Sequence, residues 1–319
     1  MSYSWGDDSS GSGSGLGFGG YDYSSARKAY SKPSDSQGKK SRSIQSASLG
    51  KAPVGQIIKS DAENIINVRI DVTGSNRANA EVFFKKLPLL YVEASRCMSD
   101  LEISFGAAGD AYTDDYPLQV RDFGQGPELD AELNALHPEG YGGGQGKETY
   151  ELNAYYDLKC CEIPNAVNPF YFLLCDEGFY PEVQPSHVRK YIGIDMDEPM
   201  SAKEVFQQLM QKFNVYILRC RYNNVHENKV HQQWVDMFGP KRVVLLEEAA
   251  RVVDCMIGII AAETGEFDDF SQRLSSRQTS VQVDSVMKSL RFVDKGLSGD
   301  SGNSIRSTGS VSMRSKKLI

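Results

Sequence analysis

The sequence has few of the features that would connect it to a membrane. Its 319 residues contain no apolar run long enough to span a bilayer. The opening segment, Met-Ser-Tyr-Ser-Trp-Gly-Asp-Asp, is polar and acidic and does not resemble an apolar leader. We therefore expect a cytoplasmic (intracellular) protein with no membrane partner.

Cysteine and histidine are scarce and are not spaced for zinc binding or for redox chemistry. None of the six cysteines forms a Cys-x-x-Cys motif. The apolar neighbours of Cys175, Cys220 and Cys255 predict buried free thiols, which are typical of a reducing compartment. The four histidines lack the spacing of metal ligands. His226 and His231, for example, are five residues apart and would not share one face of a helix.

The chain also lacks an excess of basic residues. Its 35 Lys and Arg are outnumbered by 42 Asp and Glu, which gives a net charge of −7. A dedicated nucleic-acid binder normally presents a basic face. We therefore expect no nucleic acid among its partners.

Hydrophobic residues are concentrated between two polar segments. Residues 1–57 and 296–319 are dominated by Gly, Ser and charged residues, so neither segment can bury enough surface to offset the entropy of ordering. We predict that both are disordered low-complexity tails. The chain between them should form one large domain over residues 58–265 and a C-terminal helical extension over residues 266–295.

Strand and helix patterns alternate through this central part. The strands are expected at residues 65–70, 101–106, 118–123, 170–175, 214–220 and 242–246. The helices are expected at residues 79–97 (bent or divided in two at Pro88), 127–136, 147–162, 201–213, 227–238, 247–263 and within 266–295. This alternation predicts an α/β fold with a doubly wound, mostly parallel sheet, and the compact hairpin over 101–123 predicts one antiparallel edge strand.

Oxygen-bearing side chains follow the first of these strands. Asp71, Thr73 and Ser75 stand at alternate positions in Asp-Val-Thr-Gly-Ser, where the strand ends. Ligands in open α/β sheets bind outside the carboxyl ends of strands, and hard oxygen donors suit a cation such as Mg²⁺ or Mn²⁺. The same triplet is also found in ordinary helix caps and turns.

Two further strand exits carry similar residues. A glycine-rich turn, Gly-Gly-Gly-Gln-Gly, leads into Glu148 and Thr149, and Asp176 follows the buried run 170–175. Asp110 lies in another exit turn, where it could line the rim of a site or cap the turn. The sequence therefore predicts that three bends of the chain meet around one cation.

In combination and order, these motifs resemble the von Willebrand factor A (VWA) domain. The resemblance covers residues 60–265 and implies a Rossmann-like fold with a metal-ion-dependent adhesion site (MIDAS). In the family, Asp-x-Ser-x-Ser is joined by a Thr or acidic residue and then by an Asp. Thr73 replaces the first Ser and keeps the hydroxyl, and Asp176 matches the later Asp.

The middle ligand of this site has two candidates. The glycine-rich loop followed by Glu148 resembles the branch of integrin beta subunits and of intracellular VWA proteins of the alpha-kinase type, in which the Glu reaches the metal. Other VWA domains use Thr, which would be Thr149. Either residue could instead serve as a helix N-terminal cap or as a partner of the helix dipole.

The resemblance implies a binding protein that is not an enzyme. The Ser75 and Thr73 hydroxyls would ligate the cation directly, and Asp71 and Asp176 would act through water or orient the hydroxyls. An Asp or Glu of a partner protein would take the open position, so the chain would act as an adaptor or assembly subunit. The alternatives are a metal-dependent phosphoryl-transfer or hydrolytic enzyme, and a scaffold with a vestigial site.

Two families of enzymes fit the motifs poorly. A Walker A loop needs Gly where Tyr141 stands and a hydroxyl residue where Glu148 stands. A phosphatase of the haloacid dehalogenase type needs a second Asp at the position of Thr73. Neither reading is retained.

Overall fold

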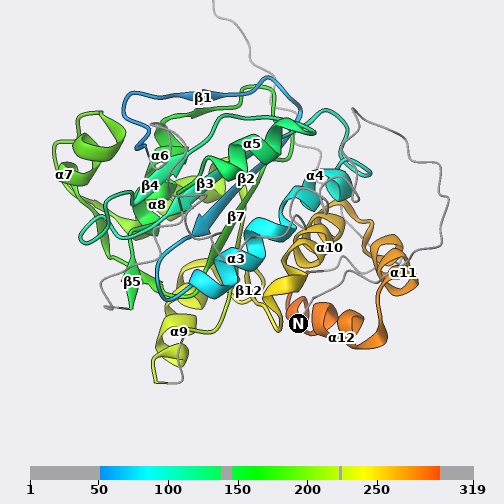
Figure 1. Cartoon of the computed structure of the whole chain (residues 1–319). Helices are drawn as coiled ribbons and strands as arrows, with labels where there is room; N and C mark the ends of the chain where they lie inside the picture. The colour runs from blue at the N-terminus through cyan, green and yellow to red at the C-terminus, as the bar shows by residue number, and fades with distance from the viewer. Residues whose placement is uncertain (1–50, 138–145, 223–224, 295–319) are drawn as a thin grey trace, which may run out of the picture.

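The computed structural model describes residues 51–137, 146–222 and 225–294 (Figure 1). Most of the predicted N-terminal tail, the whole predicted C-terminal tail and residues 142–145 of the glycine-rich turn lie outside the described residues. In the described part, a central sheet is covered by helices on both faces (Figure 1). No helix among the described residues is both long and apolar enough to cross a bilayer.

The central sheet has six strands in the order β12-β11-β7-β2-β3-β4. All neighbours pair in parallel except β3 and β4, which are antiparallel. This confirms the α/β class and the mostly parallel sheet with one antiparallel edge strand. The strands are β2 (Asn64–Asp71), β3 (Leu101–Ala108), β4 (Leu118–Val120), β7 (Phe170–Cys175), β11 (Asn214–Arg219) and β12 (Val243–Leu245).

The strand order reverses between β2 and β7. From β2 the chain proceeds outward through β3 to β4, whereas β7, β11 and β12 extend the sheet on the other side of β2. Connections on the two sides of such a switch point leave in opposite directions, and the carboxyl ends of the two strands flank a crevice. Asp71 ends β2 and Asp176 follows β7, so both residues lie at this switch point.

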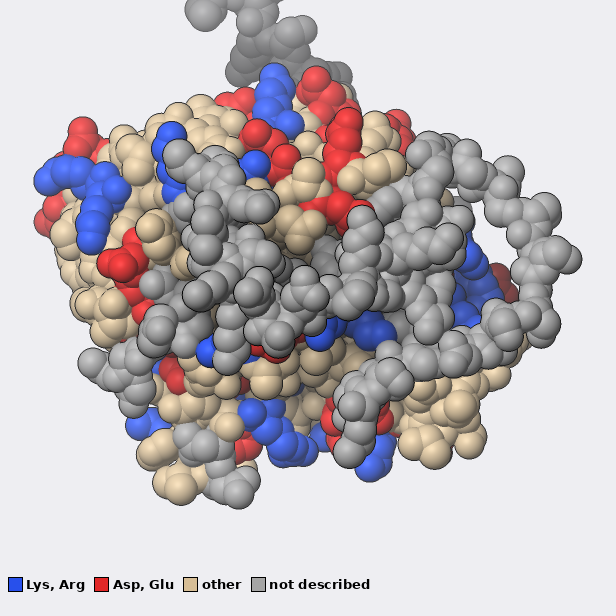
Figure 2. Space-filling model, viewed as in Figure 1, with Lys and Arg blue, Asp and Glu red and all other residues tan. Residues whose placement is uncertain are grey.

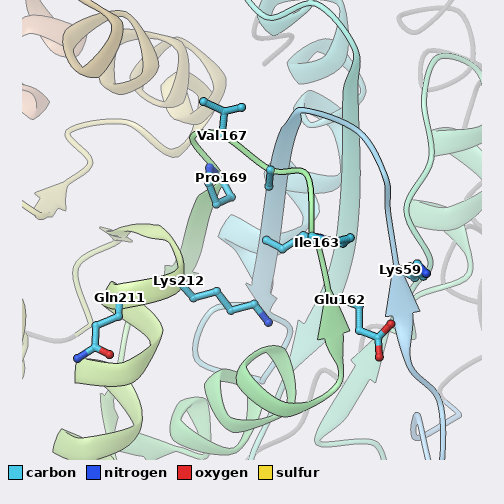
Figure 3. Close-up of a pocket in the computed structure, with 9 residues that line it drawn as sticks. Lys59, Glu162, Ile163, Val167, Pro169, Gln211 and Lys212 are labelled. Carbon is cyan, nitrogen blue, oxygen red and sulfur yellow. The ribbon is translucent and has the colours of Figure 1, made fainter. Parts of the chain in front are cut away.

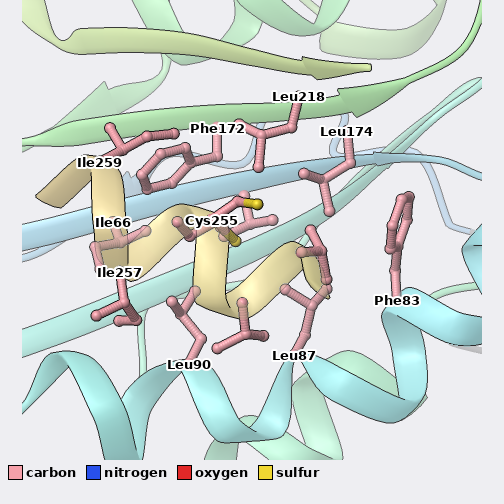
Figure 4. Close-up of a cluster of buried hydrophobic side chains, with 14 of the residues drawn as sticks. Ile66, Phe83, Leu87, Leu90, Phe172, Leu174, Leu218, Cys255, Ile257 and Ile259 are labelled. Carbon is pink, nitrogen blue, oxygen red and sulfur yellow. The ribbon is translucent and has the colours of Figure 1, made fainter. Parts of the chain in front are cut away.

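One face of the sheet carries the larger apolar core (Figure 4). Its helices are α3 (Arg77–Lys86), α4 (Pro88–Ala94), α5 (Glu128–Asn134) and α10 (Val252–Thr264). Of the two outcomes expected at Pro88, a bend or a division, the structure shows the division, because α3 ends before Pro88 and α4 begins at it. Figure 4 shows α10 between the strands that carry Phe172 and Leu218 and the helices that carry Phe83 and Leu90. This position explains why α10 is apolar on nearly all sides, Asp254 being its one fully buried charged residue.

The other face is covered by α6 (Tyr150–Lys159), α8 (Ala202–Lys212) and α9 (Glu227–Phe238). The Ser201 side chain caps α8 by accepting a hydrogen bond from the Glu204 amide at 3.2 Å. The helix predicted from residue 147 begins later, because Lys147 and Glu148 are extended as β5 and pair with β8 (Gly178–Phe179). The remaining short elements are β1 (Ile58–Lys59), β6 (Cys161–Glu162), β9 (Glu182–Val183), α7 (Pro185–His187), η1 (Val188–Ile192), β10 (Met200–Ser201) and η2 (Ala249–Arg251).

A buried ion pair joins this second face to the sheet. Arg69 of β2 and Asp157 of α6 are both fully buried, and the Arg69 Nε and Nη2 atoms donate to the Asp157 carboxylate at 2.7 and 2.5 Å. Asn67 donates to the same carboxylate at 2.9 Å, and Arg69 Nη1 donates to the Ser104 carbonyl at 3.1 Å. The paired and hydrogen-bonded geometry is what allows two charges to be buried there.

Two C-terminal helices, α11 (Phe267–Arg277) and α12 (Ser280–Ser289), pack against α10. Phe270 and Leu290 lie directly over Gly258, where a Cβ atom would come within 2.9 Å of the Phe270 ring. Arg277 donates to Glu93 of α4 at 2.5 Å. The extension therefore shares the core of the domain.

The close approach at Gly258 supplies a test of this packing. We expect Gly258→Val to lower the free energy of unfolding by about 1–3 kcal/mol, because the new methyl groups would force Phe270 and Leu290 away from α10. Urea denaturation measures the change, and Thr264→Val at the exposed end of α10 is the control. Equal stability of the two variants would contradict the contact.

Candidate functional site

The candidate site lies at the carboxyl edge of the sheet, on the side where β5 lies in Figure 1. Asp71 contributes from the end of β2, and the turn after it brings Thr73 back over its carboxylate. The Asp71 Oδ1 atom accepts hydrogen bonds from the Thr73 amide at 2.9 Å and from the Thr73 hydroxyl at 2.6 Å. The Tyr150 hydroxyl donates to Oδ2 at 2.5 Å. Asp71 is therefore held in one orientation and in turn orients the Thr73 hydroxyl.

Ser75 connects this turn to the exit of β7. Its hydroxyl lies 3.3 Å from the Thr73 hydroxyl and donates to Asp176 Oδ1 at 3.2 Å. Asp71 and Asp176 also lie close enough for each to shift the pKa of the other. The structure thus brings Asp71, Thr73, Ser75 and Asp176 into one connected group, of which only Ser75 is exposed to solvent.

Glu148 and Thr149 have different positions. The Glu148 carboxyl group is 2 % exposed, and its Oε2 atom has no hydrogen-bond partner among the described residues. The Thr149 hydroxyl donates to the Gly109 carbonyl at 2.8 Å and accepts from the Ala111 amide at 3.1 Å. Thr149 therefore fixes the loop after β3, and its hydroxyl is already used there.

Asp110, the predicted rim residue, organises the same loop. It is 1 % exposed, and its carboxylate accepts hydrogen bonds from the Tyr112 amide at 3.1 Å and from the Tyr180 hydroxyl at 3.0 Å. The structure gives Asp110 the role of a turn cap, which is one of the two roles that the sequence allows.

Sequence reasoning missed three residues of this site. Glu177 follows Asp176 in the exit turn, is 2 % exposed and hydrogen-bonds Ser75 and Tyr222 through its carboxyl group. Its position in Asp-Glu-Gly was the only sequence signal available. Tyr150 reaches Asp71 from α6, and Arg219 donates to the Asp176 carbonyl at 2.7 Å. Neither contact could be read from spacing, because each joins residues far apart in the chain.

The environment of the site disfavours the charged forms of its four acidic side chains, Asp71, Glu148, Asp176 and Glu177. Burial and, to a smaller extent, the neighbouring Asp71 raise the pKa of Glu148 to about 11, of Asp176 to about 9 and of Glu177 to about 7. Burial also raises the pKa of Asp71. Among the described residues, no Lys or Arg side chain forms a salt bridge with any of the four. Such a group is stable only with bound protons or with a cation.

The donor set fits a hard divalent cation. All of its atoms are oxygens, and two of them, Glu148 Oε2 and Glu177 Oε2, are buried without a hydrogen-bond partner in the described part of the chain. No three His, Cys, Asp or Glu side chains within the described ranges are grouped as ready metal ligands. Hydroxyl oxygens and water would therefore have to supply part of the coordination, as is common for Mg²⁺.

The raised pKa values predict how stability depends on pH. Because each folded-state pKa exceeds the unfolded value, the folded state holds these protons more tightly. The resulting stability is fully present below the unfolded pKa of about 4 and is lost as pH rises through about 7 for Glu177 and about 9 for Asp176. We expect the unfolding temperature in EDTA to fall between about pH 5 and pH 9, and excess Mg²⁺ to reverse the fall, because the cation competes with the protons.

Thermal unfolding at about pH 5, 7 and 9, with and without Mg²⁺, measures this dependence. The control is the Asp176→Asn variant, which has one fewer titrating group and should show a shallower fall. A wild-type unfolding temperature that rises with pH in EDTA would contradict the electrostatic description.

A pocket of about 680 Å³ lies at the opposite, amino edge of the sheet (Figure 3). It is lined by residues of β1, β6, the segment before β7 and the end of α8, including Lys59, Glu162 and Lys212. The Lys212 ammonium group donates to the Asp157 carbonyl at 2.9 Å at the end of α6. None of the predicted site residues lines this pocket, so it is separate from the candidate site.

No family model matches the chain, and no curated protein matches it either. Among solved structures, the chain is similar to the pilus adhesin SpaC from Lactobacillus rhamnosus GG, with a TM-score of 0.45, 11 % identity and coverage of 66 % of this chain and 32 % of that one. It is also similar to proximal thread matrix protein 1 from the mussel byssus, with a TM-score of 0.43, 8 % identity and coverage of 65 % and 49 %. The chain thus spans about a third of the adhesin and about half of the matrix protein. These values assign neither a fold family nor a function.

Proposed function

We propose that this protein is a VWA-like module that binds another protein through a divalent cation, Mg²⁺ or Mn²⁺, held in a MIDAS-like site. The observation that carries the proposal is the connected group of Asp71, Thr73, Ser75 and Asp176 at the switch point of the sheet. Beside it lie two buried carboxylate oxygens without hydrogen-bond partners among the described residues.

In this proposal the residues have distinct roles. The Ser75 and Thr73 hydroxyls would hold the cation, and Glu148 would be the third protein ligand in preference to Thr149, whose hydroxyl is used by Gly109 and Ala111. Asp71 and Asp176 orient these hydroxyls through the hydrogen bonds described above. Such orienting partners are typical of metal sites and tune their affinity.

The bound cation would supply a positive charge for an Asp or Glu side chain of the partner. Ser75 is the exposed member of the group, so the outside carboxylate would approach on its side. Tyr150, which is fully buried, closes the inner side of the group. The protein would act as an adaptor or assembly subunit, without turnover.

Calorimetric titration with Mn²⁺ and Mg²⁺ tests whether the site binds a cation. A chelator tests whether partner binding depends on that cation. Wild-type protein should bind one cation, and partners retained on immobilised protein in Mg²⁺ should be released by EDTA. The Asp71→Ala protein, if it binds no cation, should retain none of these partners.

The same variants and conditions, together with a phosphoester hydrolysis assay, separate the alternative functions. A metal-dependent phosphoryl-transfer or hydrolytic enzyme would hydrolyse a generic phosphoester in Mg²⁺ and lose this activity on Asp71→Ala. A scaffold with a vestigial site would show no cation binding and no effect of EDTA on its partners. Either result would replace the present proposal.

A further inference from the structure

Beside the candidate site, three aromatic rings form a cluster that the proposed function does not use. Tyr112 lies with its ring centroid 4.7 Å from that of Tyr180 and 4.6 Å from that of His187, the second contact being edge-to-face. Tyr112 is 51 % exposed, so its ring is open to solvent. We call Tyr112, Tyr180 and His187 the aromatic ledge.

The aromatic ledge is attached to the candidate site by direct contacts. The Tyr180 hydroxyl donates to Asp110 at 3.0 Å, and Tyr180 follows β8, which pairs with the strand that carries Glu148. Tyr112 follows Ala111, whose amide donates to Thr149 at 3.1 Å. These contacts join the ledge to the loop of Asp110 and Thr149 and to the strand of Glu148.

The surroundings of the ledge favour a positive charge. Asp110 and Glu182 both lie close enough to Tyr112 to raise the pKa of its hydroxyl, after the larger effect of burial. One ring of the ledge already accepts a cation, since the Lys147 ammonium group lies 5.6 Å from the Tyr180 centroid. Among the described residues, no Lys or Arg side chain lies over the exposed ring of Tyr112 in this way, and its neighbours include His187, whose pKa is lowered by burial.

We propose that the aromatic ledge binds a guanidinium group, so that the partner presents an arginine near the carboxylate it places on the cation. This proposal takes its role for the ledge from the proposed function above. A guanidinium plane stacks on an aromatic face and is more weakly hydrated than an ammonium group, so it loses less on leaving water. Asp110 and Glu182 add charge complementarity that an aromatic or proline side chain would not use.

A positively charged residue in the partner would also reduce electrostatic repulsion at the cation site. A partner segment with only acidic residues would be repelled by Asp110 and Glu182 beside Tyr112 and by Glu177 in the candidate site. An arginine beside the acidic residue would offset this repulsion and give the segment a fixed direction on the surface. The ledge therefore selects among acidic partners.

The test uses N-acetyl-argininamide as the probe and N-acetyl-citrullinamide as its neutral counterpart of the same shape. Binding is followed by the NMR signals of the His187 ring, which are resolvable because the chain has four histidines. We expect the arginine probe to bind about threefold to tenfold more tightly than the citrulline probe. The preference should disappear in Tyr112→Ala, persist in Tyr112→Phe and weaken in Glu182→Gln.

A second arm connects the ledge to the cation. Acetylated peptides with one Arg and one Glu, separated by one to four Gly residues, are titrated in Mg²⁺ and in EDTA. At least one spacing should bind more tightly than its citrulline counterpart and lose affinity in EDTA.

The outcomes separate the two proposals. Equal binding of the arginine and citrulline probes, or a preference that survives Tyr112→Ala, overturns the ledge as a guanidinium site, whatever the calorimetry with Mn²⁺ gives. Arginine-specific binding at Tyr112 in a protein that binds no Mn²⁺ supports the ledge and overturns the proposed function. Because Tyr112 is exposed, its variants should keep the wild-type fold, and circular dichroism checks this.

Discussion

Asp176→Ala should lower the affinity for Mn²⁺ by about 10-fold to 100-fold or more, and Ser75→Ala should have a comparable effect. Asp176 accepts a hydrogen bond from Ser75, so its loss removes a carboxyl group from the site and leaves the Ser75 hydroxyl without its acceptor. Calorimetry with Mn²⁺ measures the affinity directly.

The control for this prediction is Asp195→Ala, which removes a carboxylate whose side chain is 89 % exposed. Asp71→Ala is a less clean variant, because it would leave the Tyr150 hydroxyl and the Thr73 amide without an acceptor. If Ser75→Ala and Asp176→Ala both bind Mn²⁺ as tightly as Asp195→Ala, the assignment of the site is wrong.

Asp157→Ala should destabilise the protein by about 3–5 kcal/mol, the largest effect we expect on folding. The variant leaves Arg69 fully buried with its guanidinium group paired only to Ser104 and to a backbone carbonyl. An uncompensated charge in the interior costs far more than the pair itself contributes. The free energy of unfolding from urea denaturation gives the magnitude.

The double variant Arg69→Met with Asp157→Leu separates the pair from its packing. Because both charges are removed together, it should recover most of the stability lost in Asp157→Ala. A double variant as unstable as the single one would show that the hydrogen bonds that Asn67 donates to Asp157 and that Arg69 donates to Ser104 contribute more than the removal of charge.

Much of the fold could be predicted because its signals are local. The apolar run 170–175 is β7, Pro88 separates α3 from α4, and the compact hairpin after residue 101 gives the antiparallel edge strand. Each of these depends on side-chain pattern within a few residues. Cys175, Cys220 and Cys255 were likewise predicted as buried free thiols from their neighbours, and this is confirmed.

The rest depended on contacts between distant parts of the chain. Lys147 and Glu148 were assigned to a helix, but their pairing with β8 holds them extended. Periodicity gave no indication that Arg69 would be buried, because its partner lies 88 residues away. The same limit applies to Glu148 and Thr149: their order in the sequence could not say which of the two side chains would turn towards Gly109 and Ala111.

The packing of α11 and α12 on α10 has a practical consequence for producing this protein. The buried side chains of Phe270, Leu274 and Leu290 belong to the same apolar cluster as α10 and α4. A recombinant fragment that stopped at residue 265 would expose the apolar surface of α10 that α11 and α12 cover. Exposed apolar surfaces of this kind promote aggregation. Fragments for the binding measurements should therefore extend at least to Asp294, where the described chain ends.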